Sequence, residues 1–275
     1  MPGYQHLKRR VLLFSLLCAS CRGAELREII RGAIAAIQSD WSADVNYSYV
    51  ERDEVQKDNK LTSRTSRVVM MGGSDYYMPI ATDDRPLAPE QQKAERQKLR
   101  NEFQRRNREG AESRRRRIAT YQKARAENGA LLPEFPKAFV FEVLRKETMN
   151  GHPAWALSAT PVRRSGPLSR AAKVLSGMRG TVWLEREHYH AIRAECQVFR
   201  PVPIYGILAR VLPGTHIELQ MSPVTDSIWL MSEFSMTLTV SKFWFRSTQV
   251  THATYTDYRL NAEVLAELLS EEQRP

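Results

Sequence analysis

Short segments in which apolar and polar residues alternate make up most of this chain, and they constrain its fold more than any other feature. Residues 45–49, 61–71 and 76–80 follow this pattern, and it resumes after residue 130 and continues to residue 258. A period of two places the apolar side chains of a strand on one face of a sheet. Turn sequences such as Asn150-Gly151 join neighbouring segments as hairpins. The sequence therefore predicts an α+β fold built on an antiparallel β meander.

Helices are expected beside this meander. Residues 25–39 and 261–272 carry apolar side chains at helical spacing, which gives each segment one apolar face. A shorter helix is expected over residues 168–176. In the first segment the apolar face consists of Leu26, Ile29, Ile30, Ala33, Ile34 and Ile37.

The first residues have the layout of a secretory signal peptide. A positive cluster at residues 8–10 precedes an apolar run at 11–19, which is too short to span a bilayer, and small residues follow at 20–24. We therefore expect residues 1–23 to direct export to the periplasm. Two kinds of processing stay open: ordinary signal-peptidase cleavage, or lipoprotein processing in which Cys21 becomes the acylated first residue and anchors the protein.

Cysteine usage excludes a network of internal disulfides. The chain has three cysteines, and two of them, Cys18 and Cys21, lie in or beside the leader. The third, Cys196, lies within a predicted strand. We expect Cys196 to be a small buried apolar residue rather than a nucleophile.

Positive charge is concentrated in one part of the sequence. Residues 90–126 contain 13 Lys or Arg and 5 Asp or Glu, so this segment carries +8 of the formal net charge of +10. Its composition favours helices, and its few apolar positions predict a solvated helix or helical hairpin, inserted over residues 88–130.

The inserted segment allows several interpretations. It is either a solvated charged arm or a basic contact surface for an anionic membrane or an acidic partner. Nucleic acid ranks third, because few aromatic residues for base stacking accompany the arginines and the leader directs the protein elsewhere. The arginines expected to make such contacts are Arg105, Arg106, Arg114, Arg115, Arg116 and Arg117.

Two sequence features resemble a known family. Residues 180–195 form a hairpin whose return strand reads Ile192-Arg193-Ala194-Glu195, and the closing strand contains Thr254-Tyr-Thr-Asp-Tyr258. Together with a helix that follows a signal peptide, these features resemble the LolA/LolB-like outer-membrane lipoprotein carrier superfamily. The likeness covers roughly two thirds of the mature chain. The basic insertion departs from the family pattern.

The resemblance implies an open half-barrel over residues 24–275, partly covered by helices, which holds acyl chains or a lipidated protein and needs no cofactor. The apolar faces of several predicted strands agree with this, since apolar and Met side chains suit varied apolar guests. Alternation does not decide whether these residues line an open cavity or fill an ordinary core. The expected lining residues are Ile192, Ile217, Leu219, Met221, Ile228, Leu230, Phe234, Met236 and Leu238.

The sequence offers no recognisable catalytic centre. His188 and His190, and His216 and Glu218, are spaced two residues apart, but each pair lacks a further ligand for a metal. Nucleophile elbows, phosphate-binding glycine loops and zinc-helix motifs are absent from the sequence. We therefore expect a non-catalytic, metal-free binding protein. An envelope scaffold or sensor that binds a protein partner is the alternative, and a hydrolase ranks third.

Overall fold

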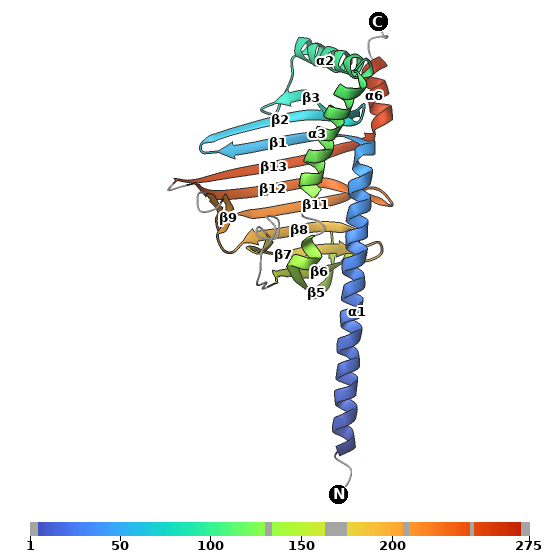
Figure 1. The fold of residues 1–275 in the computed structure, drawn as a ribbon, viewed down its shortest axis with the longest axis vertical. Helices are drawn as coiled ribbons and strands as arrows, with labels where there is room; N and C mark the ends of the chain where they lie inside the picture. The colour runs from blue at the N-terminus through green and yellow to red at the C-terminus, as the bar shows by residue number, and fades with distance from the viewer. Residues whose placement is uncertain (1–4, 130–133, 163–174, 206–208, 243–244, 271–275) are drawn as a thin grey trace.

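The computed structural model describes residues 5–129, 134–162, 175–205, 209–242 and 245–270. Its core is one antiparallel sheet of thirteen strands in the order β4-β3-β2-β1-β13-β12-β11-β8-β7-β6-β5, with β10 paired to β12 and to β9. The sheet is open rather than closed into a barrel, and helices pack on it (Figure 1). The predicted α+β fold with an open antiparallel sheet is therefore confirmed.

The strands of the first part of the chain are β1 (Tyr47–Lys57), β2 (Lys60–Met71), β3 (Ser74–Thr82) and β4 (Arg85–Pro86). The middle of the chain supplies β5 (Phe139–Met149), β6 (His152–Pro161), β7 (Met178–Glu185) and β8 (Ala191–Val198). The last strands are β9 (Val202–Tyr205), β10 (Ala209–Val211), β11 (His216–Thr225), β12 (Ile228–Lys242) and β13 (Phe245–Leu260).

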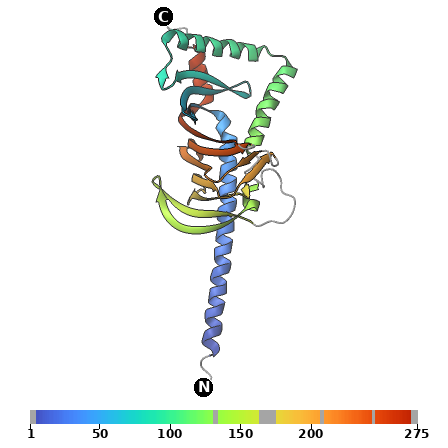
Figure 2. The same ribbon diagram turned by 90° about the vertical axis from the view of Figure 1, so that its left-hand side faces the viewer.

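The described helices are α1 (Gln5–Ala43), α2 (Pro89–Asn107), α3 (Ala111–Gly129), the short α4 (Phe135–Ala138) and α6 (Asn261–Ser270), with a 3-10 turn η1 at Asp44–Asn46. α2 and α3 are the helices of the inserted segment. Figure 2 shows α2 across the β3 end of the sheet and α3 leading from it toward α1.

Local sequence explains the hairpin turns. Asn150 and Gly151 both have positive φ values, 50° and 84°, and they join β5 to β6. Gly72 and Gly73, with φ of 57° and 89°, join β2 to β3 in the same way. Turns with two positive φ values match the twist of the flanking strands.

Three parts of the sequence prediction need comment. Within the alternating part of the chain that was expected to continue to residue 258, residues 204–212 do not belong to one strand, because β9 and β10 are two short strands that pair with each other. The helix expected over 168–176 lies largely outside the described residues. α1 runs without a break through the expected leader and the expected amphipathic helix, and ends at Ala43.

Helices cover the two faces of the sheet at opposite ends. Ile29 and Ala33 of α1 pack on Trp155, Leu157 and Leu184, and we call this side of the sheet the inner face. α2 and α6 pack near the other end, where their side chains and those of β2 and β3 form a second cluster. Its buried members are Val69, Met71, Met78, Leu99 and Val264.

Strand register shows which side chains share the inner face. Residues directly opposite each other in a ladder point to the same side. One row of such pairs crosses the sheet from β5 to β2: Val143, Leu157, Val182, Ala194, Leu219, Phe234, Ala253, Asp53 and Arg64. Leu157 belongs to the cluster under α1, so the whole row lies on the inner face. The cluster under α2 and α6 contains Val69, which directly follows the inner-facing Val68 on β2. Successive residues of a strand point to opposite faces, so this cluster lies on the other face of the sheet.

Candidate ligand-binding surface

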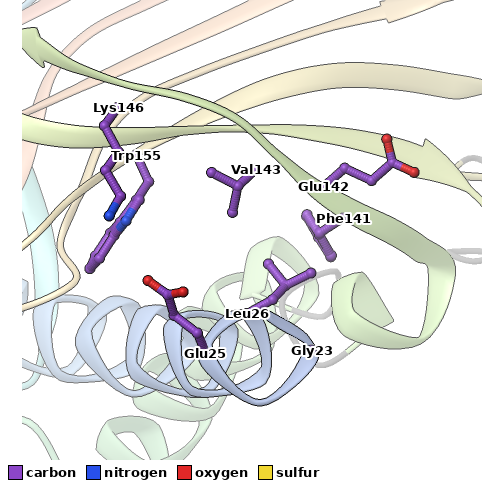
Figure 3. A pocket seen from close by; sticks show the side chains of 8 residues that line it. All are labelled: Gly23, Glu25, Leu26, Phe141, Glu142, Val143, Lys146 and Trp155. Carbon is purple, nitrogen blue, oxygen red and sulfur yellow. The ribbon is translucent and has the colours of Figure 1, made fainter. Parts of the chain in front are cut away.

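A groove lies between α1 and the edge of the sheet at β5 and β6. It has a volume of about 700 Å³. In Figure 3, Leu26 rises from α1 toward Phe141, Val143 and Trp155 of the strands. Glu25, Glu142 and Lys146 also line the groove, together with Gly23. The groove therefore combines an apolar wall from α1, β5 and β6 with a few charged groups.

The way α1 meets the sheet produces this groove. Farther along the helix, Ile29 and Ala33 are buried against the strands. Toward the N-terminus α1 passes the β5 edge and continues beyond it (Figure 1). At that edge a register shift between Val143 and Arg145 interrupts the β5–β6 ladder. Most side chains on β5 are exposed, and Val143 is 43% exposed.

The wall formed by Trp155 is held in place by its neighbours. The Trp155 ring stacks on the Tyr189 ring, with centroids 5.7 Å apart and an interplanar angle of 10°. The Arg186 guanidinium lies 5.7 Å from the Trp155 ring centroid. Aromatic stacking and cation–π contact both restrict the ring. An indole fixed in this way offers a preformed apolar surface to a guest.

Asp40 anchors the C-terminal part of α1. Its carboxylate is buried, and a hydrogen bond of 2.9 Å joins Oδ2 to Nδ1 of His190. The backbone N–H of Trp229 donates to Oδ1 over 3.0 Å. The His190 ring also stacks on the Trp229 ring, with centroids 5.5 Å apart. His190 thus serves to attach α1 to β12 and to the β7–β8 connection.

The register brings five of the predicted lining residues together. Ile217 pairs with Met236, and Leu219 pairs with Phe234, so these side chains share the inner face. Leu238 follows Met236 by two positions on β12. All five are half-buried. They lie several strands away from the groove and do not line it.

The other four predicted lining residues lie elsewhere. Ile192 is fully buried in a cluster with Trp183 and Trp229, because a register shift at the end of β7 changes the alternation of β8. Met221 packs against this same cluster and is half-buried. Leu230 is buried, and Ile228 at the start of β12 is half-buried.

The arginines of α2 and α3 divide into two groups. Arg106 is only 7% exposed, and its Nη1 donates to the Met71 and Ser74 carbonyl oxygens over 2.7 and 3.0 Å. Arg117 donates to Ser74 Oγ over 2.8 Å and pairs with Glu109. These two side chains hold the helices against the β2–β3 turn. The exposed group consists of Arg105, Arg114, Arg115 and Arg116.

Acidic neighbours neutralise part of the exposed group. Hydrogen bonds from Arg105 and Arg106 lower the pKa of Glu102 to about 2, so this carboxylate stays ionised. Arg116 pairs with Glu112 over 2.5 Å. Arg114 and Arg115 are next to Arg116 at the start of α3 and are exposed. Of the four exposed arginines, these two have the fewest acidic partners.

The structure also describes the surroundings of Cys196 and of the side chains that could bind a metal. Burial raises the pKa of the Cys196 thiol to about 11, which keeps it protonated, as its interpretation as an apolar residue requires. Within the described parts of the chain, His, Cys, Asp and Glu side chains nowhere gather in a group of three that could hold a metal ion. In those same parts, none of the helices is long and apolar enough to cross a membrane.

The residues of the groove were only partly visible in the sequence. Phe141 and Val143 alternate on a predicted strand, and Leu26 belongs to the apolar face of the first helix. Their meeting depends on which strands α1 crosses, and no local pattern encodes this. The side chains of Glu25, Glu142 and Lys146 carried no signal of a role in the groove.

The comparisons with known proteins concern the fold. The sequence matches no protein-family model and no curated protein. Similar solved structures include the LolA superfamily protein NE2245 from Nitrosomonas europaea, with 9% identity over 85% of this chain and 92% of that chain and a TM-score of 0.30. A DUF1329 family protein from Desulfovibrio piger has 9% identity, covers 90% of this chain and 97% of its own, and gives a TM-score of 0.33.

A third similar structure is the MucA/MucB complex of Pseudomonas aeruginosa, with 9% identity over 85% of this chain and 96% of that chain and a TM-score of 0.22. At these identities and TM-scores the likeness is one of general fold alone.

Proposed function

We propose that this protein binds an apolar guest, an acyl chain or the lipidated end of a protein, without covalent chemistry. The observation that carries the proposal is the groove of about 700 Å³ between α1 and β5–β6, with Leu26, Phe141, Val143 and Trp155 in its wall. Grooves that bind small molecules have volumes of about 300–1,000 Å³ and mainly apolar linings. The guest would be held by removal of its chain from water.

The energetics favour reversible binding. Each methylene removed from water contributes about 0.8 kcal/mol, and the loss of translational and conformational freedom offsets several such contributions. A chain that buries a handful of methylenes is therefore bound and released readily. Such reversible binding suits a carrier better than a permanent store.

The proposal also covers where the protein is located and what it contacts, and this part rests on the leader and on the basic helices α2 and α3. Residues 1–23 would direct the protein to the periplasm, with Cys21 as the anchor if it is acylated. Arg105, Arg114, Arg115 and Arg116 would bring the protein to an anionic membrane or an acidic partner. Arg106 and Arg117 are engaged with the β2–β3 turn and are left out of this contact.

A carboxylate placed in the groove tests the proposal. We expect Val143→Glu to weaken binding of the neutral fluorophore N-phenyl-naphthylamine by about 10-fold or more, because an apolar guest would leave the new charge without water. Val140→Glu is the matched control, since Val140 is 51% exposed on the same strand and points to the opposite side. Fluorescence titration, followed by displacement with a fatty acid, measures both variants.

Two outcomes would contradict the proposal. One is binding of the fluorophore that neither variant changes, and the other is a wild-type protein that shows no saturable binding at all. Circular dichroism of the variants establishes that each keeps its fold.

The alternative function is docking of a protein partner at the sheet edge. β5 is the last strand of the described sheet order and pairs with β6. Val140 and Leu144 on it are each 51% exposed. Exposed edge strands add strands from other chains. For an edge scaffold, Leu144→Lys would remove a copurifying partner while fluorophore binding stayed unchanged.

A further inference from the structure

The inner face changes its chemistry at β13. From β5 to β12 the row through Leu157 and Phe234 is apolar, whereas Asp53 and Arg64 continue it on β1 and β2. Glu51 is the next inner-facing residue of β1, two residues before Asp53, and four tyrosines surround it. We call this group the tyrosine–Glu51 cluster, and it consists of Tyr49, Glu51, Tyr77, Tyr255 and Tyr258.

Strand register places these side chains on the inner face. Glu51 is directly opposite Tyr255, and Tyr255 is two residues from Ala253, which belongs to the apolar row. Tyr49 is two residues from Glu51. Across β2, Val68 pairs with both Tyr49 and Tyr77, so the two tyrosines flank it on the same side.

The tyrosine rings are in mutual contact. The Tyr49 ring centroid lies 5.8 Å from that of Tyr255, edge to face, and 5.4 Å from that of Tyr258. The Tyr258 hydroxyl donates to the Met231 carbonyl oxygen over 2.6 Å, which fixes its ring. Tyr77 is 45% exposed, so the cluster is accessible from solvent.

The Glu51 carboxylate is the charged group of the cluster. Within the described residues it forms no hydrogen bond and no ion pair, although it is half-buried. Burial, and then the nearby Asp53 and Asp75, raise its pKa, and Arg64 opposes them. Burial also raises the pKa of the four tyrosines, Tyr77 to about 12, so their hydroxyls remain neutral.

This arrangement fits one class of ligand. The faces of neutral tyrosine rings attract cations, and an ammonium group can lie over them while it pairs with a carboxylate. An anionic head group would instead meet the carboxylates of Glu51, Asp53 and Asp75, with Arg64 as the cation that acts on Glu51. A half-buried carboxylate that accepts no hydrogen bond is stabilised when a cation pairs with it.

We propose that the tyrosine–Glu51 cluster binds the ammonium head group of a cationic amphiphile. This inference goes beyond the proposed function, because the tail would lie along the apolar row, past the buried Ala253 to the half-buried Phe234 and Leu219, several strands away from the groove. Adjacent strands are about 4.8 Å apart, so three strands offer the tail a path of roughly 14 Å. The cluster would thus select the head group while the half-buried residues of β11 and β12 accept the chain.

Three probes with the same decyl chain test the inference: decyltrimethylammonium, decanoate and decanol, each below its aggregation concentration. We expect the wild-type protein to bind the cation about 10-fold more tightly than decanoate, as measured by calorimetry. Glu51→Gln should remove this preference and leave the affinity for decanol unchanged. Glu54→Gln is the matched control, because Glu54 lies on the same strand, points to the opposite face and pairs with Arg52.

The pH dependence supplies a second readout. Binding of the cation requires ionised Glu51, whose pKa is raised, so affinity should begin to fall at a higher pH than for an ordinary glutamate. Tyr255→Leu, which keeps an apolar side chain, should weaken the cation several-fold and spare decanol.

Equal affinity for the cation and for decanoate would overturn the inference, as would a cation preference that survives Glu51→Gln. Neither result bears on the groove between α1 and β5, because the Val143→Glu experiment with a neutral fluorophore measures that site independently. Failure of the head-group site and failure of the proposed function are therefore distinguishable.

Discussion

Arg106 and Arg115 belong to the same basic segment and have opposite roles. Arg106 is buried, pairs with Glu102 over 2.6 Å and donates to backbone oxygens of the β2–β3 turn. Arg115 is exposed on α3. A buried guanidinium satisfies acceptors that would otherwise lose their hydrogen bonds, whereas an exposed one changes mainly the charge of the surface.

Replacing each of these arginines by alanine should therefore have different costs. We expect Arg106→Ala to lower the free energy of unfolding by about 3 kcal/mol, because it leaves buried carbonyl oxygens without a donor. Arg115→Ala should change it by about 0.5 kcal/mol or less. Urea denaturation of both variants measures the difference, and similar losses would show that Arg106 does not fasten α2 to the sheet.

At the scale of elements, α1 and α3 connect distant parts of the chain. α1 is anchored through Asp40 to His190 and Trp229 and lies over β5–β8. α3 is tied at its start to the β2–β3 turn by Arg117, and near its end Arg125 bonds Asp44 next to α1. The exposed arginines of α3, Arg114, Arg115 and Arg116, directly precede Arg117, so they are held at a fixed place on the molecule.

The proposed membrane contact of α3 can be tested by charge. We expect replacement of Arg105, Arg114, Arg115 and Arg116 by Gln to abolish sedimentation with vesicles that contain anionic lipid, because the attraction is electrostatic. Binding of the wild-type protein should also disappear in 1 M salt, where the screening length is about 3 Å.

The control variant removes the same number of exposed cations elsewhere. It replaces Lys57, Lys60, Arg210 and Arg246 by Gln, and it should keep most of the binding. If both variants bound vesicles equally weakly, net charge rather than the α3 surface would explain the attraction. Binding that survived the α3 replacements would remove the proposed role of these helices.

At the scale of the whole molecule, β13 holds the two parts of the sheet together. It pairs with β1 on one side and with β12 on the other, so the first and last strands of the chain are neighbours. The strands from β4 to β1 have no other place in the sheet order at which to join the rest. The stability of both parts therefore depends on pairings between residues far apart in sequence.

A proline in β13 tests this dependence. Thr251 is opposite Val55 on β1 and Met236 on β12. We expect Thr251→Pro to cost about 3 kcal/mol or more, because proline removes a backbone donor and does not fit the centre of a sheet. Hydrogen exchange should show reduced protection in β1–β3 and in β11–β12, while Thr251→Val leaves it unchanged. Loss of protection on one side only would mean that the two parts fold independently.

Much of the secondary structure could be predicted from the sequence. The alternating segments became β1, β2, β3 and β5–β8, and Asn150-Gly151 forms the turn that it predicts. Local backbone preferences and periodicity decide such features, so they need no tertiary information. Alternation failed at Ile192, where a register shift moves the side chain into another cluster.

The sequence by itself determined that this chain forms strands with one apolar face, flanked by amphipathic helices and interrupted by a basic helical segment. Only the tertiary structure decided that α1 covers β5–β8 and leaves a groove at Val143, that Arg106 is buried while Arg115 is exposed, and that Glu51 lies among four tyrosines. Each of these depends on contacts between residues distant in sequence. Periodicity shows which side chains share a face, but the packing of other elements determines which part of that face stays open.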